Sequence, residues 1–376
     1  MLDALTLLTG DAQSFLVSDW ASHPRIHKAD PDDLANLLSL DDVDWLLTST
    51  ALRTPALRIA KDGNVLPSSA FTRSATLAGV PLTGLIDARK VIELFDGGAT
   101  LVLQGLHRYW DPLTQLVRAL ESALGHPCQA NAYLTPPGSQ GFALHSDTHD
   151  VFVFQTYGAK QWEIHDGDTP LDVLMERGTS MYLPTGTPHS ARTQSTASLH
   201  VTVGINTSTW RQLLQRVATD VLADERYASP LPVGYPADPG ALASGLAERL
   251  RQLADSLSGL DADRLADDEA SRFLTTRSPM LRGGVADRLL VTALDDDTML
   301  SRRVGSVCAV RPAGERVRLL LGDRELTLPA RLTEVLEHIA VRDALRPRDL
   351  SPWLDAQSRL VLTRRLVREG LLQVSG

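Results

Sequence analysis

Two short segments of the chain carry side chains that could together bind a metal ion. The first segment, residues 131–147, ends in His145-Ser-Asp147, and the second, residues 184–189, is a Pro/Gly turn that ends in His189. Two imidazoles and one carboxylate are the ligand set of a non-haem Fe(II) site, which keeps coordination positions open for a co-substrate and dioxygen. These residue types therefore predict an oxygenase.

The residues around these candidate ligands indicate how they would be positioned. His145 and Asp147 are two residues apart and precede the β-branched and aromatic run 151–154, so we expect a strand in which both side chains face the same side. His189 follows a short apolar run, 181–183, and a turn rich in Pro and Gly. This order predicts that His189 comes from a neighbouring strand of the same barrel.

Other interpretations of these histidines remain open at this point. His-x-Asp is a weak pattern, and a histidine in an apolar strand is more often a packed side chain than a ligand. His149 lies four residues after His145, which is the spacing of two zinc ligands on a helix. The β-branched run that follows disfavours a helix here.

The run from Asn131 to Gln161 resembles a known family. It contains Tyr-Leu-Thr-Pro-Pro-Gly-Ser-Gln-Gly-Phe, then His-x-Asp and His-Asp-Val-Phe-Val-Phe-Gln, and Gly-x-Lys-x-Trp overlaps its end. These motifs resemble the Jumonji-C (JmjC) oxygenases of the ribosomal-oxygenase (cupin-4) branch. Residues 182–191 resemble the segment of that family that bears the second histidine, and residues 199–203 resemble the strand after it. The resemblance implies that His145, Asp147 and His189 bind iron.

The resemblance also implies a binding site for 2-oxoglutarate. Lys160, fifteen residues after His145, matches the basic residue that binds the far carboxylate of this co-substrate in relatives, and Tyr133 matches a tyrosine that helps to hold it. Only four of the 37 basic residues are lysines, and a buried dicarboxylate needs a cation to offset its desolvation. The alternative is a solvated turn lysine.

Two further residues are candidates for contact with the co-substrate. Asn131 stands at the head of the motif, and His200 lies in the strand-like run 198–203. The alternative for Asn131 is an amide at a turn or strand end, and the alternative for His200 is a hydrogen-bonded core histidine. Gly-x-Ser-x-Gly, phosphate-loop, dinucleotide-binding and Cys-x-x-Cys motifs do not occur in the chain.

The resemblance implies an α+β fold and an Fe(II)- and 2-oxoglutarate-dependent dioxygenase. We expect a double-stranded β-helix (a cupin or JmjC barrel), a helical dimerisation module and a C-terminal winged helix. Relatives hydroxylate arginine or histidine of ribosomal proteins, which predicts a protein or peptide substrate. Demethylation of an N-methyl group and hydroxylation of a peptide natural product use the same iron site and stay open. Ser146 is small where relatives often carry an aromatic residue, which leaves the target residue undetermined.

The apolar patterns divide the chain into three segments. Residues 1–205 are expected to form the catalytic barrel, 206–285 the helical module and 286–376 the winged helix. Helical periodicity appears over 210–222, 241–257 and 261–274, and a Pro/Gly stretch at 229–240 interrupts it. In the resembled family the corresponding helices form a homodimer interface. The alternative is a helical layer that only packs against its own barrel.

The C-terminal segment shows strand-like runs at 302–310 and 316–328, helices at 330–340, from 348 and at 356–369, and a last strand at 371–374. A winged helix often binds DNA, so a metal- or ligand-sensing regulator with a non-catalytic cupin is the second functional hypothesis. From residue 328 onward there are eight arginines against six acidic residues, four of the arginines on the last helix, while the whole chain has a net charge of −9. Binding to duplex DNA normally requires a clear basic face, so direct nucleic-acid binding is not expected.

Length and composition fit a cytoplasmic enzyme of more than one domain. The 376 residues are 43% hydrophobic, which is enough for a sizeable core. No basic stretch precedes the first apolar run, and no apolar run is long enough to cross a bilayer. Cys128 and Cys308 are expected to be free thiols in a reducing compartment.

Overall fold

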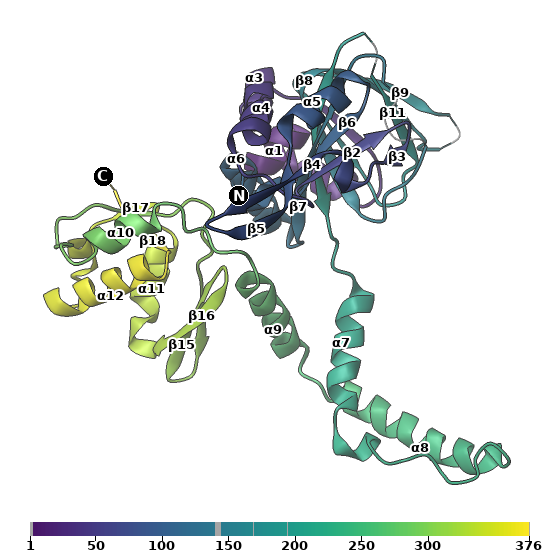
Figure 1. Cartoon of the computed structure of the whole chain (residues 1–376). Coiled ribbons are helices and arrows are strands. Elements are labelled where there is room, and N and C mark those ends of the chain that lie inside the picture. The colour runs from purple at the N-terminus through teal and green to yellow at the C-terminus, as the bar shows by residue number, and fades with distance from the viewer. Residues whose placement is uncertain (1–2, 140–143, 168, 194, 376) are drawn as a thin grey trace. The chain divides into compact units, whose positions relative to one another are not determined.

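The structure is a computed structural model that describes residues 3–139, 144–167, 169–193 and 195–375. It divides into two compact units, Met1–Ser208 and Thr209–Gly376 (Figure 1). The boundary lies three residues after the end expected for the catalytic barrel. The further division of the second unit at residue 285 stays a prediction.

The first unit is built on one large sheet. Its strand order is β1-β10-β8-β12-β7-β6-β2-β3, with β9 and β11 also paired to β8. All of these pairings are antiparallel. The strands of the unit, including the separate β4–β5 hairpin, are β1 (Arg25–Lys28), β2 (Leu57–Lys61), β3 (Asn64–Val65), β4 (Thr72–Leu77), β5 (Val80–Ile86), β6 (Thr100–Leu103), β7 (Cys128–Thr135), β8 (Asp150–Ile164), β9 (Leu171–Glu176), β10 (Thr179–Leu183), β11 (His189–Arg192) and β12 (Ser198–Ile205).

The long strand β8 belongs to two sheets and closes the barrel. Its first half pairs with β10 and β12, and its second half pairs with β9 and β11. Gly158 lies between the two halves with a φ of 64°, and a Cβ there would lie 1.8 Å from the carbonyl oxygen of Ala197. Only glycine fits this position, because the left-handed backbone and the close approach both exclude a side chain. The strand can therefore pass from one sheet to the other, as a cupin-type barrel requires.

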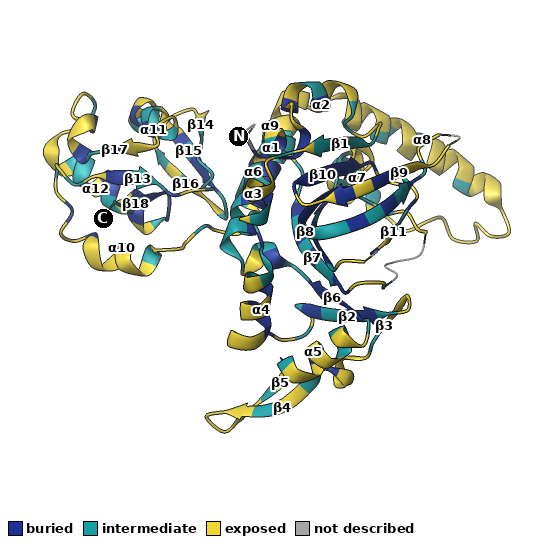
Figure 2. Ribbon diagram, turned by 90° about the horizontal axis from the view of Figure 1, so that it is seen from above, coloured by how far each residue is buried: buried dark blue, intermediate teal, exposed yellow. Residues whose placement is uncertain are grey.

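Helices cover the outside of the barrel, with their apolar sides turned inward (Figure 2). In α6, Leu113, Leu116, Val117 and Leu120 are buried at helical spacing. The fully buried aromatic rings of Phe15, Phe152 and Tyr182 join α2, β8 and β10 in the main core. The helices are α1 (Asp3–Thr9), α2 (Ala12–Ser18), α3 (Pro31–Ala35), α4 (Leu40–Ser49), α5 (Ala88–Asp96) and α6 (Asp111–Leu124), with short 3-10 turns η1 (Ser68–Ala70) and η2 (Leu106–Arg108).

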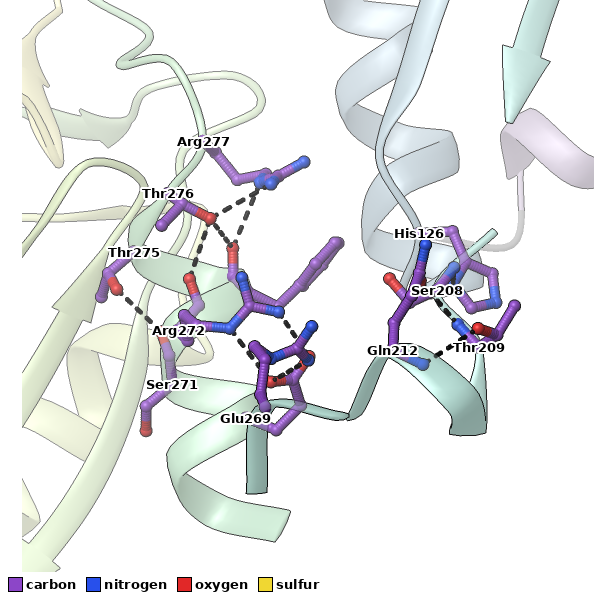
Figure 3. A network of polar contacts seen from close by, with 12 residues as sticks. His126, Ser208, Thr209, Gln212, Glu269, Ser271, Arg272, Thr275, Thr276 and Arg277 are labelled. Atoms are coloured by element: carbon purple, nitrogen blue, oxygen red, sulfur yellow. Dashed lines mark hydrogen bonds and ion pairs between the residues drawn. The ribbon is translucent and has the colours of Figure 1, made fainter. Parts of the chain in front are cut away.

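The second unit begins with the predicted helices α7 (Trp210–Leu222), α8 (Pro239–Ser258) and α9 (Ala262–Thr275), with a 3-10 turn η3 (Glu225–Tyr227). Thr209 and Gln212 form a capping box that starts α7 (Figure 3). Glu269 on α9 accepts from Arg272 and forms an ion pair with Arg216 of α7 at 2.8 Å. The periodicity in the sequence was therefore a correct guide to all three helices.

The rest of this unit contains the elements α10 (Gly284–Leu290), β13 (Leu300–Arg302), β14 (Ala309–Ala313), β15 (Arg316–Leu321), β16 (Arg324–Pro329), η4 (Ala330–Leu332), α11 (Thr333–Ala340), β17 (Ala344–Leu345), η5 (Pro347–Leu350), α12 (Ala356–Arg368) and β18 (Leu372–Val374). Both predicted strand-like runs contain strand, but a turn interrupts each of them. The run 316–328 is a hairpin, because Gly322 and Asp323 form a turn between β15 and β16. The run 302–310 holds only the ends of two strands, because Gly305 adopts a φ of 72° in a turn between them.

A separate hydrophobic core holds these elements together, with Leu300, Leu319, Leu336 and Leu366 among its fully buried members. Among the described residues, no helix combines the length and the apolar character needed to span a membrane. Cys128 and Cys308 are both free thiols, as expected.

Candidate metal centre and co-substrate pocket

The barrel of the first unit encloses a cavity of about 280 Å³. The register of the sheet explains which side chains enter it, because alternate residues of a strand face the same side. Asn131 on β7 is opposite Thr202 on β12, which is opposite Val153 on β8. The lining residues are Arg58, Ala60, Asp62, Gly63, Thr100, Gln129, Asn131, Tyr133, His145, Asp147, His149, Val151, Val153, Lys160, Trp162, His189, Ala191, His200, Thr202 and Gly204.

Three of the lining residues form the metal-binding group expected from the sequence. One ligand atom from each of His145, Asp147 and His189 lies within 4.8 Å of the other two. His145 and His189 exchange backbone hydrogen bonds, with N–O distances of 3.1 and 2.8 Å. The expected strand at 145–147 was wrong, because only the bridge at His145 is paired and β8 begins at Asp150. The ligands are brought together by the backbone pairing of His145 with His189, and not by the alternation of side chains along one strand.

The turn at 184–188 is fixed by a buried carboxylate. Asp150 accepts hydrogen bonds from the Thr185 amide at 2.7 Å and from the Tyr182 hydroxyl at 2.8 Å. The Gly186 amide donates to the carbonyl of Asp147 at 2.9 Å, which ties this turn to the ligand loop. The two segments that carry the ligands are therefore clamped to each other.

The ring of His189 is oriented for metal binding. Its Nδ1 lies 2.9 Å from the carbonyl oxygen of Thr187, and a carbonyl only accepts, so Nδ1 carries the proton and Nε2 keeps its lone pair. Nε2 lies 3.8 Å from Oδ2 of Asp147. Burial lowers the pKa of His189, which favours the neutral ring that a metal requires. A carbonyl that fixes the second nitrogen is a common support of histidine ligands.

The chemistry of this donor set fits a divalent metal of the first transition series. Two imidazoles and one carboxylate without a thiolate suit Fe(II) with open coordination positions. His189 is buried, Asp147 is half-buried and His145 is exposed, so the site borders both the cavity and its mouth. His149 is not part of the group, although it lines the same cavity.

Lys160 reaches the cavity from the second half of β8 and is only 3% exposed. Its Nζ lies 3.3 Å from the hydroxyl of Thr135, and it forms no ion pair with the residues that the structure describes. Burial lowers the pKa of Lys160 to about 8. A buried ammonium group without a carboxylate partner is costly, so this position is prepared for an anionic ligand. The solvated turn lysine considered above is not what the structure contains.

Tyr133, His200 and Asn131 also line the cavity. The rings of Tyr133 and His200 stack at 4.9 Å and 3°. Burial, with a smaller contribution from the charge of Lys160, holds the pKa of His200 well below its usual range, so this ring is neutral. Asn131 has a structural partner, because its Oδ1 accepts from the Gly105 amide at 2.9 Å. All three therefore border the space beside Lys160, and their roles stay proposals.

Several lining residues were not singled out in the sequence. Arg58 comes from β2, a short strand far from the motif in sequence, and its position follows only from the pairing of β2 with β6 and of β6 with β7. Thr135 does not line the cavity but contacts Lys160, and this contact could have been considered because Thr135 lies inside the Tyr-Leu-Thr-Pro-Pro motif. Trp162 packs 5.8 Å from His189 and 5.5 Å from His200, and the alternation from Lys160 along β8 could have indicated it.

Comparison with known proteins agrees with this geometry. A family model described as a JmjC domain matches residues 106–172 and 165–213. Ribosomal oxygenase 2 of Mus musculus is 32% identical over 212 residues, covering 48% of this chain and 45% of that protein. The bifunctional lysine-specific demethylase and histidyl-hydroxylase NO66 of Branchiostoma floridae is 35% identical over 153 residues, covering 39% of this chain and 25% of that protein. The chain thus spans less than half the length of these two relatives.

Solved structures support the fold over nearly the whole chain. The Escherichia coli ribosomal oxygenase YcfD superposes with a TM-score of 0.57 at 18% identity, covering 98% of this chain and 99% of that one. A structure of YcfD in complex with cobalt and 2-oxoglutarate gives a TM-score of 0.55 at the same identity and coverage. The resemblance inferred from the motifs is confirmed: residues 106–213 match the JmjC-domain model, and the chain is similar to ribosomal oxygenases in sequence and in fold.

Proposed function

We propose that the chain is an Fe(II)- and 2-oxoglutarate-dependent oxygenase that hydroxylates a side chain of a protein or peptide. The observation that carries the proposal is that one cavity is lined by a His/Asp/His group and by a buried lysine that has no anionic partner among the described residues. The names of the relatives support it, since they include ribosomal oxygenases, a histidyl-hydroxylase and a structure with cobalt and 2-oxoglutarate.

Each residue has a distinct task in this proposal. When bound, iron and 2-oxoglutarate activate dioxygen, release CO2 and succinate, and insert one oxygen atom into a C–H bond of the substrate. His145, Asp147 and His189 would hold the metal, since their ligand atoms lie within 4.8 Å of one another. Lys160 binds the far carboxylate of the co-substrate, with Thr135 beside it.

The remaining residues shape the co-substrate space. Tyr133 and His200 provide a stacked, neutral wall, and Asn131 faces the same space while its oxygen holds Gly105. Trp162 packs between His189 and His200 and limits the entry of water at this point.

Turnover of 2-oxoglutarate tests this function. Full-length protein with Fe(II) and ascorbate should convert 2-oxoglutarate to succinate slowly without substrate and faster with ribosomal proteins stripped from a strain that lacks the gene. His145→Ala should abolish both rates, whereas Thr148→Ala, an exposed neighbour that does not line the cavity, should keep them. Equal turnover by His145→Ala would refute the ligand assignment.

We propose a basic protein, such as a ribosomal protein, as the substrate. The chain's net charge of −9 favours such a partner. Mass spectrometry of ribosomal proteins from the deletion strain should show one protein that has lost the mass of one oxygen atom. Loss of a methyl-removing activity instead would identify a demethylase, and a change only in small peptides would identify a natural-product hydroxylase.

We also propose the finer organisation expected from the sequence. Residues 206–285 act as a dimerisation module, because α7 and α8 carry exposed apolar side chains such as Trp210, Leu214 and Leu250. Residues 286–376 form a winged helix, an assignment supported by α11, α12 and the three-stranded antiparallel sheet β14-β15-β16. Free thiols at Cys128 and Cys308 support a cytoplasmic location.

The second hypothesis is a DNA-binding regulator with a non-catalytic cupin. The last helix offers it little support, because Arg359 pairs with Asp296 and Arg365 pairs with Glu369, while Arg364 donates to the Leu294 carbonyl. A gel shift on random duplex DNA at low salt tests it, and binding that weakens with added salt would favour the regulator.

A further inference from the structure

The cavity extends past the metal ligands to a wall that the proposed reaction does not yet use. On β7, Thr135 contacts Lys160 at one end of the cavity, and Gln129 lies six residues earlier, about 20 Å away along an extended strand. Gln129 is opposite Gly204 on β12, which is opposite Val151 on β8. All three line the cavity, so its wall continues well beyond the co-substrate end.

The ring of His149 is seated on this wall. A Cβ at Gly204 would lie 2.6 Å from Nε2 and 2.7 Å from Cδ2 of His149, so the imidazole rests against the bare backbone of β12. A glycine inside a strand often marks such a close approach. The same position would lie 3.6 Å from Cγ of Gln129, so His149 and Gln129 are neighbours there.

The backbone that carries His149 is held by the clamp that fixes the metal ligands. The carbonyl of Asp147 accepts from Gly186, and the carboxylate of Asp150 accepts from Thr185 and Tyr182. His149 lies between these two anchored residues. Its position relative to the metal group is therefore set by the same contacts as the group itself.

The hydrogen-bonding groups of this wall are uncommitted within the described part of the chain. No hydrogen bond, ion pair or ring contact joins the ring of His149 or the amide of Gln129 to another described side chain. The ring nitrogens of His149 and the amide of Gln129 are not among the buried polar atoms that lack a partner. The basic lining residues come from other rows of the cavity wall: Lys160 is on the second half of β8, and Arg58 is opposite Val102, which is opposite Tyr133.

We propose that His149 and Gln129 position the target side chain of the prime substrate, and that this side chain is planar and bears nitrogen, namely a guanidinium, imidazole or carboxamide group. The His149 ring stacks on its plane, and the Gln129 amide and a ring nitrogen form hydrogen bonds to its edge. This inference rests on the proposed function: if 2-oxoglutarate occupies the end of the cavity at Lys160, the target side chain can occupy the other end. Both residues are positioning residues and transfer no proton.

The variants distinguish the packing of the His149 ring against β12 from the hydrogen bonds that the ring forms. His149→Phe keeps a planar ring and removes both nitrogens, and His149→Gln restores a hydrogen-bonding group. Gly204→Ala pushes the ring out of its seat, and Gln129→Leu removes the amide without touching His149. Thr148→Ala and Gly245→Ala are the matched controls, since a Cβ at Gly245 meets nothing within 4 Å.

Relaxation by Mn(II) provides a readout that does not need turnover. Full-length protein loaded with Mn(II) and 2-oxoglutarate is mixed with blocked arginine amide, blocked glutamine amide or, as an apolar control, blocked leucine amide. Proton relaxation of each probe reports how much of it lies near the metal, and electron paramagnetic resonance gives the amount of bound Mn(II). Circular dichroism checks that each variant is folded.

We expect Mn(II) to relax the arginine and glutamine probes more than the leucine probe. This difference should fall about five- to tenfold in His149→Phe, Gly204→Ala and Gln129→Leu, and return in part in His149→Gln, as the loss of one or two hydrogen bonds implies. Unchanged relaxation in folded His149→Phe and Gln129→Leu would overturn the inference and leave the proposed function intact. Failure of the wild-type protein to retain Mn(II) would overturn both.

Discussion

Among single residues, Lys160 contributes most to the proposed binding of 2-oxoglutarate. Burial lowers its pKa to about 8, so its charge is present below pH 8 and is lost as the pH rises through that value. We therefore predict that the wild-type affinity for 2-oxoglutarate falls above pH 8. Lys160→Met should weaken binding about 10- to 100-fold at pH 7, as the loss of a charged hydrogen bond implies, and should show no such fall. Lys160→Arg should also lack the fall, because arginine keeps its charge. Isothermal titration calorimetry with Mn(II)-loaded protein measures each affinity, and a wild-type affinity that stays constant to pH 10 would contradict the assignment.

At the scale of elements, the bend of β8 at Gly158 decides whether the two halves of the site meet. Gly158→Ala adds a Cβ 1.8 Å from the Ala197 oxygen, whereas Gly167→Ala shares the positive φ but meets nothing within 4 Å. We predict a loss of about 1 kcal/mol in the free energy of unfolding for Gly167→Ala and a distinctly larger loss for Gly158→Ala. Urea unfolding measures both, and equal losses would show that the bend is not needed.

The elements also show what the sequence could predict. The helices of the second unit follow from periodicity, and the ligands follow from residue type and motif. The local structure at His145 and Asp147 could not be predicted, because pairing with His189 is a contact between residues 44 apart. The hairpin at Gly322 was missed although Gly322-Asp323 is a turn signal, because the apolar residues on both sides of it were taken as one strand. His149, Gln129 and Gly204 become neighbours only through the register of β12 with β7 and β8, which no local pattern contains.

For the whole molecule, the proposed dimer would bury the apolar side chains that α7 and α8 expose. Leu214 and Leu250 are 60% and 57% exposed, and a charge at either should be tolerated by the fold but not by an apolar interface. We predict that Leu214→Glu and Leu250→Glu sediment as monomers, while Val233→Glu, in the exposed Pro/Gly stretch between α7 and α8, sediments as the wild-type dimer. Sedimentation velocity tests this, and a monomeric wild-type protein would exclude the proposed module.

The visible absorption of the anaerobic protein with Fe(II) and 2-oxoglutarate tests whether His145, Asp147 and His189 bind one iron. Chelation of ferrous iron by the keto acid gives a charge-transfer band only if the metal is held with adjacent open positions. We predict this band at one iron per chain in the wild-type protein and in Thr148→Ala, and its loss in His189→Ala. A wild-type protein without the band, or a His189→Ala variant with a band of equal intensity, would contradict the convergence of His145, Asp147 and His189 on one iron.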